Sequence, residues 1–166
     1  MDKQSIRGRV YKFGDNINTD MINPAQYMEL SMEVMIAHAM EGSDPDFSKK
    51  VRPGDILVVG KNFGSGSSRE TAPMVIQGSG ISLIIAEQYA RIFYRNAINI
   101  GLKVLTCDAV DELRDGDELE VFPAKGVIKN LTTQKQYQCP PLPGHILELV
   151  NDGGLINHLD KKLNHH

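Results

Sequence analysis

Between residues 55 and 106, short apolar segments alternate with segments of helical periodicity. Residues 55–59, 81–86 and 102–106 have the apolar composition of buried strands, whereas residues 69–77 and 87–99 can form helices that end close to a glycine. Each strand, helix and strand fits within about thirty residues, the length of a right-handed parallel crossover. The middle of the chain is therefore predicted to be α/β.

The flanking segments predict further elements around this unit. An opening strand precedes a loop rich in turn formers at 14–20, and apolar residues at helical spacing between Ser31 and Gly42 predict an amphipathic helix. After Cys107, turn residues separate short alternating segments, as in a hairpin. With 166 residues and no internal repeat, we expect one domain over residues 1–166 with a flexible tail. The flanking elements expected are strands at 6–13, 118–122, 127–131 and 136–138 and helices at 31–42, 145–150 and 155–163.

Composition excludes several classes of protein. The chain is 41% hydrophobic and 23% charged with a net charge of −3, so neither disorder, nor a membrane protein, nor a basic surface for nucleic acid is indicated. No signal segment follows Met1, which favours a cytoplasmic protein. Cys107 and Cys139 have no metal-ligand spacing, and we expect two reduced thiols.

The segment most typical of a functional site is a glycine-rich loop. It follows the apolar strand at 55–59, precedes a helix, and reads Gly-Lys-Asn-Phe-Gly-Ser-Gly-Ser-Ser-Arg-Glu over residues 60–70. Free backbone N–H groups at a helix start attract carboxylates and phosphates. The loop is therefore predicted to bind an anion.

Known nucleotide motifs do not fit this loop. Gly64 and Gly66 supply two glycines of a dinucleotide fingerprint, but Arg69 stands where the third is required. Lys61 lies on the wrong side for a P-loop, and no glycine follows the serines as a nucleophile elbow requires.

Two serines and an arginine remain as the chemical groups of the loop. Backbone N–H groups and the guanidinium of Arg69 would favour an ionised Ser67 hydroxyl, the condition for a serine base, and Arg69 suits a substrate carboxylate. Ser68 supplies a second hydroxyl. The structural alternative is that Ser67 caps the helix while Arg69 pairs with Glu70 or another surface acid.

The segment between Lys12 and Lys49 contains no lysine or arginine. It cannot clamp an anion with a side-chain cation. Its Asp15 and Asp20 are either site carboxylates or the turn-forming residues of the loop that follows the first strand.

Three motifs together resemble the small subunits of two-chain hydro-lyases of the aconitase superfamily, and most closely those of 3-isopropylmalate dehydratase. The resemblance covers about residues 6–163. The motifs are Gly-Asp-Asn-Ile-Asn-Thr-Asp at 14–20, the glycine-rich loop at 60–70, and Ala-Glu-Gln-Tyr-Ala-Arg-Ile-Phe-Tyr-Arg-Asn-Ala-Ile-Asn-Ile-Gly at 86–101.

The resemblance implies a fold, a partner and residue roles. The fold would be a swivelling β/β/α domain, with a mixed, barrel-like sheet and flanking helices, that closes over a large subunit carrying a four-iron four-sulfur cluster. Ser67 would be the base that removes a proton from the substrate, and Ser68 and Arg69 would bind a carboxylate. Thr19 and Asp20 would lie at the edge of the active site. Without cluster cysteines, this chain would bind no metal and be inactive alone.

The resemblance also places substrate selection in the loop after Pro24. Family members that act on tricarboxylates carry an arginine there, whereas this loop has none. The departure speaks against aconitase and homoaconitase and favours an alkyl group, as in 3-isopropylmalate or 2,3-dimethylmalate. The residues expected to contact that group are Gln26, Tyr27, Met28 and Leu30.

Several functions therefore remain under comparison. The first is the small subunit of an isopropylmalate dehydratase of leucine biosynthesis, acting on a small hydroxy-dicarboxylate. A related dehydratase for 2,3-dimethylmalate, citramalate or homocitrate is the nearest alternative. A non-catalytic anion-binding module and a serine hydrolase are the alternatives from other classes, and no histidine stands in a recognisable triad context for the latter.

Overall fold

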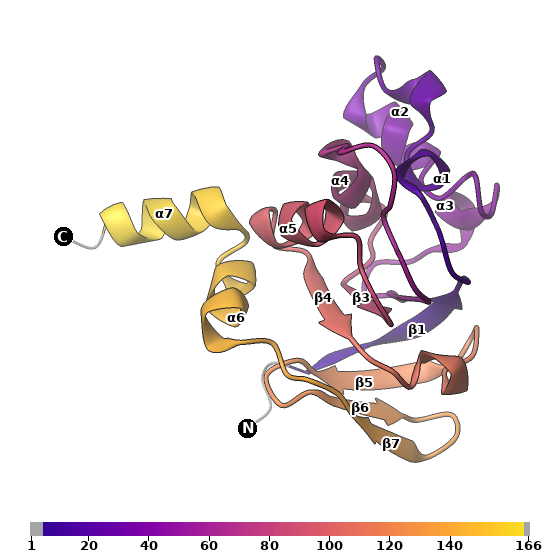
Figure 1. Cartoon of the computed structure of the whole chain (residues 1–166), viewed down its shortest axis with the longest axis vertical. Helices are drawn as coiled ribbons and strands as arrows, with labels where there is room; N and C mark the ends of the chain where they lie inside the picture. The colour runs from indigo at the N-terminus through magenta and orange to yellow at the C-terminus, as the bar shows by residue number, and fades with distance from the viewer. Residues whose placement is uncertain (1–4, 165–166) are drawn as a thin grey trace.

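The computed structural model describes residues 5–164, which form one mixed sheet with helices packed around it (Figure 1). Within these residues the strand order is β4-β3-β2-β1-β5-β6-β7. The first four strands pair in parallel, and the last three add an antiparallel meander beside β1. The strands are β1 (Ile6–Lys12), β2 (Ile56–Val59), β3 (Leu83–Ala86), β4 (Lys103–Thr106), β5 (Glu118–Phe122), β6 (Val127–Asn130) and β7 (Lys135–Gln138).

Helices occupy the connections between the parallel strands and the C-terminal end of the described chain. The expected C-terminal tail, with His165 and His166, lies outside the described residues. The helices are α1 (Thr19–Ile22), α2 (Met32–Ala37), α3 (Phe47–Lys50), α4 (Thr71–Gly78), α5 (Arg91–Asn99), α6 (Gly144–Asn151) and α7 (Leu155–Leu163), with 3-10 turns η1 (Ala25–Tyr27) and η2 (Val110–Glu112). None of the helices in residues 5–164 combines the length and apolar character needed to cross a bilayer.

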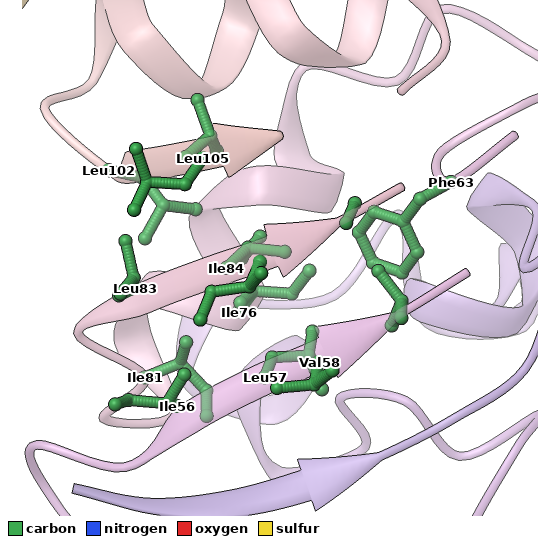
Figure 2. Packing of buried hydrophobic residues seen from close by; sticks show 14 of the residues in the cluster. Ile56, Leu57, Val58, Phe63, Ile76, Ile81, Leu83, Ile84, Leu102 and Leu105 are labelled. Carbon is green, nitrogen blue, oxygen red and sulfur yellow. The ribbon is translucent and has the colours of Figure 1, made fainter. Parts of the chain in front are cut away.

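The core lies between the parallel strands and α4. Every residue of β2 and β3 is buried, which explains why these strands are uninterrupted apolar runs rather than alternating patterns. Figure 2 shows Leu57 of β2, Ile84 of β3 and Ile76 of α4 packed together, with the ring of Phe63 at the ends of the two strands. The strand–helix–strand prediction for residues 55–106 is confirmed.

The helix predicted from Ser31 to Gly42 is shorter than expected. Ser31 caps it as predicted by accepting a hydrogen bond from Val34 N, but the α-helix ends at Ala37. Met40 then adopts a positive φ of 59° and donates its N–H to Ile22 O at 2.8 Å. After Ala37 the backbone therefore bonds to α1 instead of continuing the helix: Met40 N donates to Ile22 O and Gly42 N donates to Met21 O. Side-chain periodicity could not reveal this tertiary contact.

The predicted starts of two other helices were wrong. The helix expected from residue 87 begins at Arg91, because the residues before it pair with the glycine-rich loop: Phe63 N donates to Gln88 O and Ala90 N donates to Phe63 O. The helix expected from residue 69 begins at Thr71. Both differences place more residues in loops at the same edge of the sheet.

Gly42 controls the position of α1, so its substitution should destabilise the fold. An added Cβ would lie 2.6 Å from Met21 Cα, a backbone contact that only a shift of α1 could relieve. We predict that Gly42→Ala lowers the free energy of unfolding by roughly 1–3 kcal/mol in urea titrations. Gly14→Ala is the matched control, because nothing lies within 4 Å of its added Cβ. Equal stability of the two variants would contradict this packing.

Candidate active site

The glycine-rich loop leaves the C-terminal end of β2 and is anchored there by Phe63. This side chain is 1% exposed and packs edge-on against Phe93 of α5, with ring centroids 5.0 Å apart. Gly64 follows with a φ of 83°, and a Cβ there would lie 2.3 Å from Phe93 Cγ. The loop therefore requires glycine at this position, both for its backbone conformation and for its close approach to α5.

The loop at 14–20 holds the other side of the glycine-rich loop. Gly64 N donates to Ile17 O and Thr19 N donates to Ser65 O, each at 2.8 Å. Asp15 Oδ1 accepts a hydrogen bond from Lys61 N at 2.7 Å. Asp15 thus has the structural role of a turn-forming carboxylate, and the first two sequence motifs form one unit.

Ser67 lies on the surface of this unit with its hydroxyl beside Thr19. The two Oγ atoms are 3.1 Å apart, and either can be the donor. Thr19 is only 3% exposed, whereas Ser67 and Ser68 are exposed. The first motif and the serine motif are therefore in direct contact, a pairing that the sequence did not indicate.

The alternative that Ser67 caps the following helix is wrong. The N-cap position of α4 is Glu70, and no side chain caps it. Ser67 precedes this position and accepts a hydrogen bond at its backbone oxygen from Arg69 N at 2.9 Å. The Ser67 hydroxyl therefore does not cap the start of α4.

Arg69 is fixed by the end of α1. Its Nη1 donates to Asn23 O at 2.7 Å and to Asp20 Oδ1 at 3.2 Å. Asp20 also accepts from Ala25 N at 3.0 Å, and this N–H, followed by the guanidinium, lowers the pKa of Asp20. The Arg69 side chain is 17% exposed. Its Nη1 is therefore held by Asn23 and Asp20, while part of the guanidinium remains open to solvent. The structural alternative for Arg69, a pair with Glu70 or another surface acid, is therefore met by Asp20, whose side chain is 64% exposed.

Asn23 is a contributor that sequence reasoning missed. It is fully buried, and its Nδ2 donates to Thr71 Oγ1 at the first residue of α4 while its backbone oxygen holds Arg69. In the sequence, Asn23 and Pro24 indicated only the end of a regular element. Residue type could not reveal this role, because Asn23 holds Arg69 through its backbone carbonyl, a group that every residue has.

The loop after Pro24 divides into an inward and an outward part. Tyr27 stacks on His38, with ring centroids 3.8 Å apart, and its hydroxyl donates to Glu41 Oε1 at 2.8 Å. In contrast, Gln26, Met28 and Leu30 are exposed. Of the four residues expected to contact the substrate, three are therefore open to solvent and Tyr27 holds the loop against the region after α2.

Comparison with known proteins agrees with this arrangement. A family model for the aconitase C-terminal domain matches residues 4–109. The 3-isopropylmalate dehydratase small subunit 1 of Thermotoga maritima is 52% identical over 158 residues, covering 94% of this chain and 95% of that protein. The methanogen homoaconitase small subunit of Methanothermobacter thermautotrophicus is 48% identical over 159 residues, covering 95% and 92%.

A solved structure confirms the fold. The crystal structure of 3-isopropylmalate dehydratase from Methanocaldococcus jannaschii matches with a TM-score of 0.93 and 42% identity, over 97% of this chain and 96% of that one. The expected mixed sheet with flanking helices is thereby confirmed, as is the resemblance inferred from the three motifs. The chain belongs to the aconitase C-terminal domain family.

Proposed function

We propose that this chain is the small subunit of a two-chain hydro-lyase that interconverts 2-isopropylmalate and 3-isopropylmalate by removing and re-adding water. The observation that carries the proposal is the junction of two loops that places the exposed Ser67 and the anchored Arg69 on one surface, each held by residues 19–23. The names of the similar proteins support the substrate class and the presence of a large-subunit partner.

The side chains of this surface suit the proton-transfer half of such a reaction. Removing a proton from the carbon next to a carboxylate requires a base close to a cation that holds that carboxylate. Ser67 is proposed as the base, with Thr19 able to donate to its oxygen and so favour the ionised hydroxyl. Arg69 and Ser68 are proposed to bind the carboxylate, and Asp20 to orient the guanidinium.

Departure of the substrate hydroxyl needs a Lewis acid, which a four-iron four-sulfur cluster supplies when bound. The residues of this chain do not fit such a cluster. Cys107 and Cys139 are its only cysteines, and both are buried. We therefore assign the cluster to the large subunit, which would complete the site above the exposed serines.

The alternative of a serine hydrolase receives no support from the site. Ser67 has Thr19 as its hydroxyl partner, and within residues 5–164 no histidine hydrogen-bonds to it. A hydrolytic serine needs a neighbouring base that accepts its proton.

Replacement of Ser67 should remove the base. In a complex assembled with a cluster-bearing large subunit, we predict that Ser67→Ala lowers kcat by roughly 10²–10⁴-fold with little change in KM, measured by the absorbance of the alkene intermediate. The matched control is Ser48→Ala, which removes a half-buried serine hydroxyl that donates to Ala37 O at 2.6 Å. Full activity of Ser67→Ala would overturn the assignment of the base.

Loss of the Asp20 carboxylate should leave Arg69 with one anchor fewer. We predict that Asp20→Asn raises KM by about 10-fold and that Arg69→Gln raises it further, because the second change also removes the positive charge that binds substrate. Steady-state kinetics of the assembled complex measure both effects. Arg7→Gln, which removes an exposed pair with Glu118, is the control. An unchanged KM in Arg69→Gln would contradict the carboxylate clamp.

The loop after Pro24, which contains no lysine or arginine, should discriminate against substrates that carry a third carboxylate. We predict that kcat/KM for homocitrate is lower than that for 3-isopropylmalate by about 10²-fold or more, since the extra carboxylate would lose water without gaining a cation. Met28→Arg should narrow this difference, because residue 28 is exposed within the loop. Comparable turnover of the two substrates by the unmodified protein would show that the loop does not select the alkyl group.

A further inference from the structure

The loop at 25–30 is attached to the rest of the domain chiefly through Tyr27. Tyr27 is half-buried and packs against the hydrophobic core, whereas every other residue of the loop is exposed. The N–H groups of residues 27, 28 and 30 donate only to oxygens of residues 24–27, and Ala25 N, bonded to Asp20 Oδ1 at 3.0 Å, holds only the start of the loop. The Tyr27 side chain therefore carries the contacts that hold the middle of the loop.

The carboxylate of Glu41 binds two side chains at once. Its Oε1 accepts a hydrogen bond from the Tyr27 hydroxyl at 2.8 Å, and its Oε2 is bonded to His38 Nδ1. The rings of Tyr27 and His38 are stacked, with centroids 3.8 Å apart and planes 9° apart. The three side chains thus form a closed triangle in which each contacts both of the others.

The charges within this triangle support its hydrogen bonds. The bond from His38 lowers the pKa of Glu41, burial opposes this effect, and the Tyr27 hydroxyl lowers the pKa further. The bond to Glu41 is also the main cause that raises the pKa of Tyr27. Near neutral pH the glutamate is therefore a charged acceptor and the tyrosine a neutral donor, and a hydrogen bond to an ionised acceptor is stronger than a neutral one.

The triangle is fixed to the helix that contacts the proposed base. The two chain neighbours of Glu41 donate their N–H groups to α1, at 2.8 Å to Ile22 O and at 3.1 Å to Met21 O. The first residue of α1 is the threonine whose hydroxyl lies beside Ser67. The position of the loop relative to Ser67 therefore depends on the segment that carries Glu41.

We propose that His38 and Glu41 are positioning residues for substrate selection, which act by holding Tyr27 and with it the loop at 25–30. Met28 and Leu30 of this loop are 37% and 52% exposed, and they contact the alkyl group of a substituted malate, which gains free energy by leaving water. His38 and Glu41 act on the substrate only through the loop. The inference rests on the function proposed above, because the selectivity concerns that class of substrate.

Hydrogen exchange of the full-length chain tests the positioning without a substrate or a partner subunit. Glu41→Ala removes both hydrogen bonds of the triangle, whereas Tyr27→Phe keeps the stacked ring and removes one. We expect the amides of residues 27–30 to exchange about 10-fold faster in Glu41→Ala and to show a smaller increase in Tyr27→Phe. Unchanged protection of β2 and β3 shows that each variant is folded.

The control for the exchange experiment is Tyr137→Phe, which changes a half-buried tyrosine of β7. Its loop at 25–30 should exchange at the wild-type rate. Wild-type exchange of this loop in both Glu41→Ala and Tyr27→Phe would overturn the claim that the triangle holds the loop.

Kinetics of the complex with a cluster-bearing large subunit test the selection. We expect Glu41→Ala to raise KM for 3-isopropylmalate by about 10-fold and to change kcat by less than about 3-fold, since no reacting group is altered. The inhibition constant of malate, which keeps both carboxylates but has no alkyl group, should change by less than about 2-fold. Equal losses for the two ligands, or an unchanged KM for 3-isopropylmalate, would overturn the assignment.

Further variants test whether the three side chains act as one unit. His38→Phe keeps a stacked ring, so it should raise KM less than His38→Ala does. Adding Tyr27→Phe to Glu41→Ala should change KM by less than about 2-fold, because the bond between the two residues is already lost. Independent, multiplied effects of the two changes would contradict a shared contact.

The two kinds of experiment separate this inference from the proposed function. A wild-type complex with no activity on 3-isopropylmalate would refute the function and the selectivity together, while the exchange rates of the isolated chain would still decide whether the triangle holds the loop. An active wild-type complex with fast loop exchange in Glu41→Ala but unchanged discrimination against malate would refute the selectivity alone.

Discussion

The candidate site depends on the pairing of two loops that are far apart in the sequence. The loop at 14–20 supplies backbone partners to the glycine-rich loop through Ile17 and Thr19, while Phe63 fixes the same loop against α5. Because β1 and β2 are neighbouring parallel strands, their C-terminal ends lie at one edge, and the loops that follow them are brought together. The positions of Ser67 and Arg69 are consequences of this pairing.

The same edge of the sheet carries more than the proposed catalytic groups. The residues after β3 also lie at this edge, because Phe63 N donates to Gln88 O and Ala90 N donates to Phe63 O. The glycine-rich loop after β2 is therefore held by the segments that follow both neighbouring strands, β1 and β3.

Much of the fold could be predicted from the sequence because its elements have clear signals. Buried parallel strands read as apolar runs, and β5 agrees with its predicted bounds of 118–122. The short helices α1 and α3, each of four residues, could not be predicted because one turn shows no periodicity. The early end of α2 also escaped prediction, since Met40 exchanges a helical bond for one to Ile22, a contact that depends on tertiary structure.

The site was predicted more completely in its residue types than in its interactions. The serines and Arg69 stand out because hydroxyls, glycines and a cation are concentrated in one loop. Their partners were less visible: Asp20 was ambiguous between a turn and a site, and Asn23 acts through its backbone oxygen.

Deuterium incorporation by the assembled complex is the most direct measure of whether Ser67 moves the substrate proton. The complex would be incubated with 3-isopropylmalate in D₂O, and deuterium at the carbon next to the carboxylate would be followed by mass spectrometry. If Ser67 is the base, the wild-type complex incorporates deuterium and the Ser67→Ala complex does not, although it still binds the substrate. Deuterium incorporation at the wild-type rate in the Ser67→Ala complex would contradict the proposed role of Ser67 as the base.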